Sequence, residues 1–237
     1  MTGFRFTFAA VFSAVSLLSA ADAGKKKESA PAKAPDAGPQ LSVANSGKTG
    51  LLPDNTTSLA NKAAQAFAKH DWDAARVAYR EMIGTEPENP LAWANLGAVE
   101  QQAGKPAAAA ECFEKSVMYN PELVQSWLAL GLIYSKRGDK YRAMSAFARA
   151  IHEDPLNAQG HNYLAIVAKD LGWTDAAEGE LQRAIELNPG YGNAHFNLAL
   201  MYLERKPPAL ELAKRHYARA TALGVEKDEI VERKLKE

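Results

Sequence analysis

Several kinds of residue recur in this sequence at one fixed interval of 34 residues. The series are Pro87, Pro121, Pro155 and Pro189; Gly104, Gly138 and Gly172; Ala75, Ala109, Ala143 and Ala177; and Tyr79, Phe113, Phe147 and Leu181. Independent series that share one period indicate a repeat architecture, in which each unit packs mainly on its neighbours. This period limits the possible folds more than any other feature of the chain.

A single unit has the pattern of two short helices. Apolar residues in 127–134 fall at i, i+3, i+4 and i+7, which is typical of one buried helical face. Gly138 follows, and glycine supplies the left-handed conformation that commonly ends a helix. A second apolar stripe covers residues 143–150, and Pro155 prevents that helix from continuing. Each helix would be marginal alone, so we expect the hairpins to be stable only as a stack.

Small residues lie at equivalent points of the two helices. In the unit just described these are Gly131 on the first helix and Ala143 on the second. We expect the two backbones to approach closely there, because a larger side chain would be strained.

The pattern resembles the tetratricopeptide repeat. The residues that carry the resemblance are Trp127, Leu130, Gly131, Tyr134, Ala143, Phe147, Ala150 and Pro155. Four units depart from it. The first has Lys62 and Ala66 where Leu and Tyr are usual, and the second has Glu100 at the position of Tyr134, here called the tyrosine slot. The last two have His161 and His195 at the position of Trp127, here called the tryptophan slot. The resemblance implies an all-α fold, a right-handed α-solenoid of stacked helical hairpins. It divides the chain into five units, at about 56–89, 90–123, 124–157, 158–191 and 192–225.

The two ends of the sequence differ from the repeats. Residues 1–23 combine an N-terminal positive charge, a short apolar run and an Ala-Asp-Ala site, which is the pattern of a secretory signal peptide. Residues 24–55 form a Lys-, Ala- and Pro-rich linker that we expect to be disordered. Residues 226–237 are expected to form a polar helix that caps the last hairpin. The signal-peptide pattern of residues 1–23 predicts export to the periplasm, the cell surface or the medium.

The composition argues against several classes of function. The 28 Lys and Arg balance the 28 Asp and Glu, so the sequence lacks the basic excess of a nucleic-acid-binding protein. Cys112 is the single cysteine, which excludes an internal disulfide framework, and we expect it to be inert. The histidines show no metal-binding spacing, and no nucleophile has a positioned base. We therefore predict no enzyme activity, no cofactor, no metal and no membrane insertion of the mature chain.

The resemblance also implies where a partner would bind. In tetratricopeptide proteins the face of each first helix that is turned from the core stripe lines a concave groove. The corresponding residues here are Leu91, Ala94, Ala98, Gln101, Gln125, Leu128, Leu132, Ser135, Gln159, Asn162, Ile166, Lys169, Asn193, Phe196, Leu200 and Leu203. We expect Leu128, Leu132, Ile166, Phe196 and Leu200 to form a solvent-facing apolar patch, and such patches usually mark interaction sites.

Two alternatives stay open at this stage. About half of these side chains could pack between neighbouring first helices and never touch a partner. The occupant could be a segment of another protein, which we favour, or the chain's own linker or another copy of the chain. The last case would make the protein a self-associating or self-occluded structural element.

Overall fold

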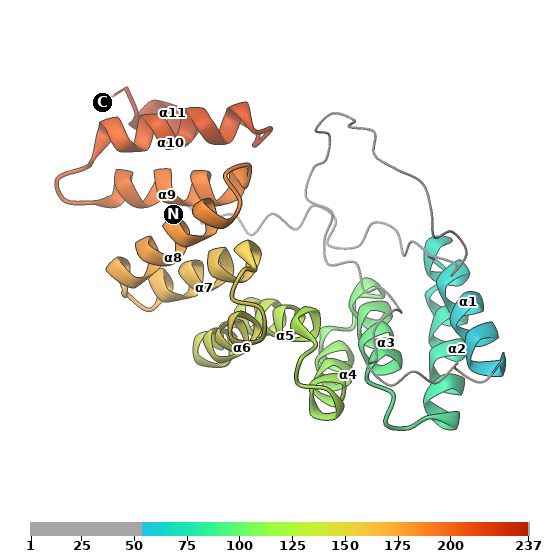
Figure 1. Cartoon of the computed structure of the whole chain (residues 1–237). Coiled ribbons are helices and arrows are strands. Elements are labelled where there is room, and N and C mark those ends of the chain that lie inside the picture. The colour runs from blue at the N-terminus through green and yellow to red at the C-terminus, as the bar shows by residue number, and fades with distance from the viewer. Residues whose placement is uncertain (1–53, 237) are drawn as a thin grey trace, which may run out of the picture. The chain divides into compact units, whose positions relative to one another are not determined.

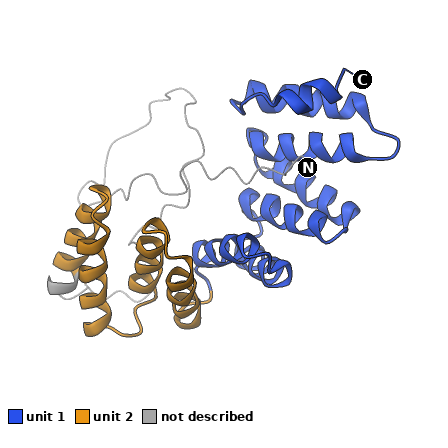
Figure 2. Ribbon diagram, turned by 180° about the vertical axis from the view of Figure 1, so that it is seen from behind, with its two compact units in different colours: residues 1–7, 122–237 blue, residues 8–121 orange. Residues whose placement is uncertain are grey.

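The computed structural model describes residues 54–236, and all of the regular secondary structure in this range is helical. The described residues belong to two compact units, an N-terminal unit of residues 54–121 and a C-terminal unit of residues 122–236 (Figure 2). The predicted all-α helical repeat fold is confirmed. The predicted signal peptide lies outside the described residues, as does the linker except for its last two positions, which belong to the first helix.

The N-terminal unit contains two helical hairpins (Figure 1). Its helices are α1 (Asp54–Ala68), α2 (Trp72–Thr85), α3 (Pro90–Gln102) and α4 (Pro106–Tyr119). Each helix packs on the next one along the chain, so α2 contacts both its partner α1 and the following first helix α3.

The C-terminal unit contains three hairpins and one short final helix (Figure 1). Its helices are α5 (Val124–Lys136), α6 (Lys140–Glu153), α7 (Ala158–Asp170), α8 (Thr174–Leu187), α9 (Gly192–Glu204), α10 (Leu210–Ala222) and α11 (Glu229–Lys234). From α5 to α10 consecutive helices contact one another, and the first helices α7 and α9 also touch directly.

Local sequence signals account for the helix ends. Gly138 has a φ of +77°, a left-handed conformation that favours glycine, and it reverses the chain between α5 and α6. After this turn, the Asp139 side chain accepts a hydrogen bond from the Arg142 amide and caps α6. Asn89 and Asn157 cap α3 and α7 in the same way. Such caps satisfy amides that have no partner inside the helix.

Gly131 is small for a different reason from the one expected. A Cβ placed on this glycine of α5 would overlap the ring of Phe147 on α6. In the N-terminal unit, a Cβ on Gly97 would lie 3.0 Å from the ring of Phe113. Glycine therefore makes room for a buried aromatic ring of the second helix. The expectation was that it would allow the two helix backbones to approach each other near Ala143. Ala143 itself is fully buried.

Helix α11 completes the apolar core of the last hairpin. Val231 of α11 is buried in a cluster that contains Phe196 and Leu200 of α9 and Tyr217 of α10. The Tyr217 hydroxyl accepts a hydrogen bond of 2.7 Å from the amide of Asp228, which precedes α11. The C-terminal segment is therefore held on α9 and α10 by both apolar and polar contacts.

Candidate binding surface

The sixteen predicted groove residues all lie on first helices. Four belong to α3 in the N-terminal unit, and four each to α5, α7 and α9 in the C-terminal unit. They occupy the same four slots of each helix. The first and fourth residues lie near the helix ends, and the second and third, here called the middle slots, lie between them. Binding of a partner by these residues stays a prediction.

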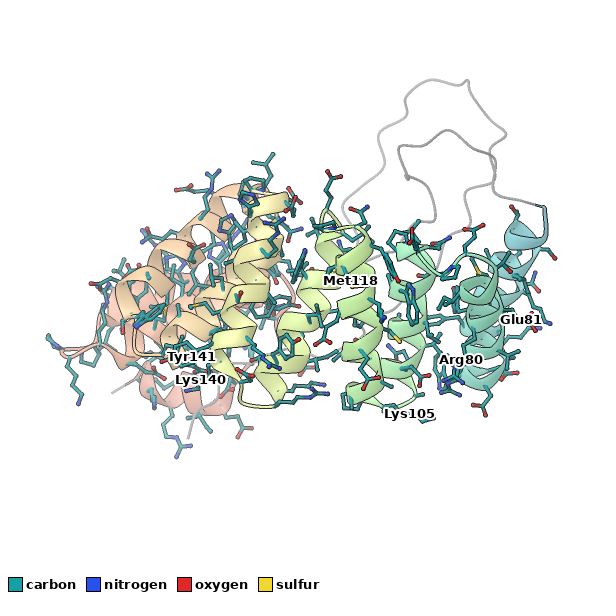
Figure 3. The ribbon with its side chains drawn as sticks, turned by 90° about the horizontal axis from the view of Figure 1, so that it is seen from below. Arg80, Glu81, Lys105, Met118, Lys140 and Tyr141 are labelled. Carbon is teal, nitrogen blue, oxygen red and sulfur yellow. The ribbon has the colours of Figure 1, made fainter. Side chains whose placement is uncertain are left out.

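The expected solvent-facing apolar patch is absent from the described residues. Its five members, Leu128, Leu132, Ile166, Phe196 and Leu200, are each at most 4% exposed. The large apolar side chains that are exposed lie instead on second helices, in connecting loops or on α11; examples are Met118 of α4 and Tyr141 of α6 (Figure 3). The expectation was therefore wrong about exposure.

Contacts within the C-terminal unit explain this burial. Leu128 of α5 lies against Gly160 of α7, at 3.7 Å from the position a Cβ would take there. Phe196 and Leu200 of α9 belong to the cluster that Val231 of α11 completes. Leu128 therefore packs between neighbouring first helices, as the alternative interpretation expects. Phe196 and Leu200 are instead covered by α10 and α11, where the repeats end.

The polar groove residues of α7 are also engaged within the unit. The Asn162 side-chain oxygen accepts a hydrogen bond of 2.9 Å from Asn197 of α9. Lys169 forms an ion pair of 2.7 Å with Glu204 at the end of α9. Lys169 is the single charge among the sixteen predicted residues, so this pair neutralises the charge of the face.

The accessible part of the face lies at the ends of the first helices. In the C-terminal unit, the N-terminal ends carry the half-buried amides Gln125, Gln159 and Asn193. The C-terminal ends carry Ser135, Lys169 and Leu203, also half-buried. In the N-terminal unit, Leu91 and Gln101 occupy the corresponding ends of α3, while Ala94 and Ala98 between them are buried.

Two of these amides have an unused hydrogen-bonding atom. The side-chain oxygens of Gln101 and Gln125 are shielded from solvent and accept no hydrogen bond. A buried amide oxygen without a donor is costly, because it has lost water without gaining a protein partner. Both side chains are only half-buried as a whole, so rotation of the amide would expose the oxygen to a donor on a bound chain.

The tryptophan slot has a common hydrogen bond that the sequence did not reveal. Trp93 Nε1 donates to the backbone carbonyl of Pro87 at 2.8 Å. His161 Nε2 lies 3.1 Å from the carbonyl oxygen of Pro155, so this nitrogen carries a proton. His195 makes the equivalent bond to Pro189. Histidine can replace tryptophan at this slot because both rings donate to the carbonyl of the preceding closing proline.

Each slot histidine has a second partner on the following helix. His161 Nδ1 lies 2.6 Å from Glu180 Oε2, and His195 Nδ1 lies 3.0 Å from His216 Nδ1. The two slot histidines therefore pair with second-helix residues, and both are buried. Sequence reasoning did not identify Glu180 or His216. The signal was a polar residue 19 or 21 positions after each histidine, where the tryptophan units have Cys112 and Ala146.

The two pairs shift their histidine pKa values in opposite directions. The hydrogen bond to Glu180 raises the pKa of His161 above 6.5, against the effect of burial. Burial lowers the pKa of His195, and burial together with the charges of His195 and Arg215 lowers the pKa of His216 to about 4. The His195–His216 pair is therefore uncharged at neutral pH.

Other chemistry is sparse in the part of the chain that the structure describes. Burial, with help from Glu100 and Glu111, raises the pKa of the Cys112 thiol to about 11, so the reactive thiolate is scarce at neutral pH. No group of three or more His, Cys, Asp or Glu gathers within residues 54–236. None of the described helices is long and apolar enough to cross a membrane.

The geometry defines an α-helical repeat protein built from hairpins of two short helices. A family model described as "Tetratricopeptide repeat" matches residues 61–117, 99–158 and 162–223, together about two thirds of the chain. The chain belongs to the tetratricopeptide repeat family. No curated protein matches its sequence at a significant level.

Solved structures share the fold. A MamA crystal structure has 25% identity and a TM-score of 0.64, and the match covers 73% of this chain and 93% of that one. YrrB, described as a TPR protein with an unusual peptide-binding site, has 17% identity and a TM-score of 0.62, with 78% and 98% coverage. PilF of Pseudomonas aeruginosa has 16% identity and a TM-score of 0.65, with 73% and 78% coverage.

Proposed function

We propose that this protein is an exported, non-catalytic adaptor that binds a peptide or helix of a partner protein on the first-helix face. The observation that carries the proposal is the series of amides at one slot of three successive first helices, Gln125 on α5, Gln159 on α7 and Asn193 on α9. An amide offers both a donor and an acceptor, which suits it to the backbone of a bound segment. Membership of the repeat family, and the peptide-binding site described for YrrB, support a protein ligand.

The burial of the middle slots changes where the partner would lie. A ligand on this face meets the amide-lined ends of the first helices, because Leu132 and Leu200 between them are already covered. The Gln125 side-chain oxygen has no donor inside the protein, and rotation of this half-buried side chain would present it to a backbone N–H of that ligand. We therefore favour a segment that crosses the N-terminal turns of α5, α7 and α9 and is recognised mainly through its main chain.

The test is affinity capture from an envelope extract of the native host. The bait is the mature chain, residues 24–237, compared with Gln125→Ala combined with Gln159→Ala. A matched control replaces Ser145 and Gln182, which are exposed on the second helices α6 and α8. The expected result is a protein retained by the wild type and the control but lost with the amide variant. The same proteins on all three baits, or none, would reject this surface.

A second candidate is a self-occluded or self-associating structural protein. It is favoured by α11, since this C-terminal helix already covers Phe196 and Leu200 of α9. In this case the linker of residues 24–55, or another copy, would occupy the remaining face. Light scattering of residues 24–237 and 56–237 distinguishes the two. A change of mass on removal of the linker would favour self-association, and two monomers with partner capture would favour the adaptor.

Export is proposed from the sequence of residues 1–23. Cleavage after Ala23 would leave Gly24 as the first residue of the mature protein. The check is the intact mass of the protein isolated from its host. A mass that includes residues 1–23, with the protein in the cytoplasm, would contradict export.

A further inference from the structure

The closest pair of histidine side chains in the described residues joins α9 to α10. Nδ1 of His195 lies 3.0 Å from Nδ1 of His216, with the ring centroids 5.2 Å apart and the ring planes at 30°. When both rings are neutral, this contact is one N–H···N hydrogen bond. The same placement also suits a metal ion, because both nitrogens that face each other are strong ligands for transition metals.

The spacing between the two nitrogens is that of neighbouring ligands on one metal ion. Zinc binds histidine nitrogen at about 2.0–2.1 Å in tetrahedral geometry, which places two such nitrogens about 3.3 Å apart. Square-planar geometry, which copper and nickel prefer, brings neighbouring nitrogens to about 2.9 Å. The observed 3.0 Å lies between these values. In the hydrogen-bonded contact the ring nitrogens point at each other, so each ring must turn by about 35–45° for both nitrogens to meet at one metal ion in tetrahedral or square-planar geometry.

The surroundings already orient one ligand. The ring of His195 donates to the backbone carbonyl of Pro189, and because Nδ1 faces His216, the donor is Nε2. A neutral ring with its proton on Nε2 has a free lone pair on Nδ1. Histidines that bind metals commonly donate their other ring N–H to a backbone carbonyl in this way, which fixes the tautomer and the ring orientation.

The second ligand also needs a change of tautomer. In the hydrogen-bonded pair His216 carries its proton on Nδ1, because Nδ1 of His195 accepts. When a metal enters, this proton moves through solvent to Nε2 of His216 and Nδ1 becomes a ligand. No net proton is released, because both rings stay neutral.

The equivalent slots of the other units hold different chemistry. They pair Leu59 with Ala78, Trp93 with Cys112, Trp127 with Ala146, and His161 with Glu180. A tryptophan cannot bind a metal, and His161 is already engaged by a carboxylate at 2.6 Å. The last hairpin is therefore the unit in which two imidazoles meet at these slots.

We propose that His195 and His216 form a two-histidine site for a divalent transition metal, Cu²⁺, Ni²⁺ or Zn²⁺, which clamps α9 to α10. Since the described residues contain no cluster of three or more ligand side chains, water completes the coordination. The expected preference follows the usual order for nitrogen ligands, with Cu²⁺ bound most tightly. Mg²⁺ and Ca²⁺, which require oxygen ligands, should not bind there.

The probe for the test is Ni²⁺, which unlike Cu²⁺ does not oxidise Cys112. The mature chain is prepared without a polyhistidine tag, freed of metal by chelator and titrated in a calorimeter, and its thermal unfolding is followed with and without Ni²⁺. We expect one saturable site and a melting temperature that rises with Ni²⁺ concentration, since a ligand of the folded state alone stabilises it. His216→Gln should lose both effects, and His195→Gln should do the same.

Two controls keep the result unambiguous. His152→Gln removes an exposed histidine of α6 and should bind Ni²⁺ like the wild type, and Mg²⁺ should raise no melting temperature. His216 is only half-buried, so its variant can be tested even if His195→Gln does not fold. Binding that persists unchanged in folded His216→Gln, or no saturable binding by the wild type, would overturn the proposal.

Discussion

The two units fill equivalent slots of the repeat with different polar side chains. Between hairpins, the N-terminal unit joins Arg76 of α2 to Glu100 of α3, with Nε–Oε1 at 2.6 Å and Nη2–Oε2 at 3.1 Å. The C-terminal unit joins residues with the same spacing of 24, but here the Tyr202 hydroxyl of α9 donates to Glu178 of α8 at 2.9 Å. The N-terminal unit therefore has a buried ion pair where the C-terminal unit has a hydrogen bond from a tyrosine hydroxyl to a carboxylate.

Inside the hairpins it is the C-terminal unit that has the ionisable pair. The N-terminal unit fills the tryptophan slot of α3 with Trp93, while the C-terminal unit fills that of α7 with His161 and pairs it with Glu180. In both units the ring nitrogen still reaches the carbonyl of the preceding proline. The difference teaches that a slot sets position and approximate volume, and that its chemistry changes whenever a neighbouring residue can satisfy the buried polar atoms.

The largest expected effect comes from breaking the ion pair. Glu100→Gln leaves the Arg76 charge buried, with the exposed Asp73 as its remaining acidic contact. Removing one partner of a buried pair costs about 3–5 kcal/mol of unfolding free energy. Urea unfolding, followed by circular dichroism, should show the loss.

A second variant tests whether the slot tolerates the chemistry of the other unit. Arg76→Met combined with Glu100→Tyr removes both charges and restores an aromatic ring at the tyrosine slot. Stability within about 1 kcal/mol of the wild type is expected, since apolar replacement of a buried pair is often neutral or favourable. A double variant as unstable as Glu100→Gln would show that the pair itself is needed.

A smaller effect is expected at the matching contact of the C-terminal unit. Tyr202→Phe removes one hydrogen bond to Glu178 but keeps the ring, over which the Arg205 guanidinium lies 5.0 Å from the centroid. Glu178 also retains its ion pair with Arg205. The loss should be about 1 kcal/mol, measured by the same urea unfolding. A loss as large as that of Glu100→Gln would remove the distinction between the two junctions.

The sequence predicted the fold because the 34-residue period and the helical stripes are local signals. It predicted Glu100 as a departure but not Arg76, because the two are 24 residues apart and belong to different series. The partner became visible only when the packing of α2 on α3 was known. In the same way, His161 and His195 were recognised as slot residues, whereas Glu180 and His216 were not.

Exposure of the predicted groove could not be obtained from spacing. The spacing of Leu128 and Ile166 places them correctly on the first helices, turned from the hairpin core. Whether that face meets water depends on how closely α5, α7 and α9 approach one another, which is set by residues such as Gly160 and by the bond between Asn162 and Asn197. Periodicity contains no information on that approach.

The smallest effect is a pH dependence at the ionisable pair of α7 and α8. The folded pKa of His161 is raised by Glu180, so the pair contributes its full stability below pH 6.5, the pKa of unfolded histidine. This contribution is lost as the pH rises through the folded pKa. Arg183, the other charge that acts on His161, opposes the shift. The N-terminal unit, with Trp93 at this slot, has no equivalent titration.

Glu180→Gln isolates this contribution, since an amide can still accept the hydrogen bond but bears no charge. The unfolding free energy of the wild type minus that of the variant, measured in the presence of a chelator from pH 5.5 to 9, should decrease as the pH rises. His195 and His216 are present in both proteins, so their own titration cancels in the difference. A difference that stays constant over this range would mean that the Glu180 charge does not shift the pKa of His161, and the pair would then contribute no pH-dependent stability.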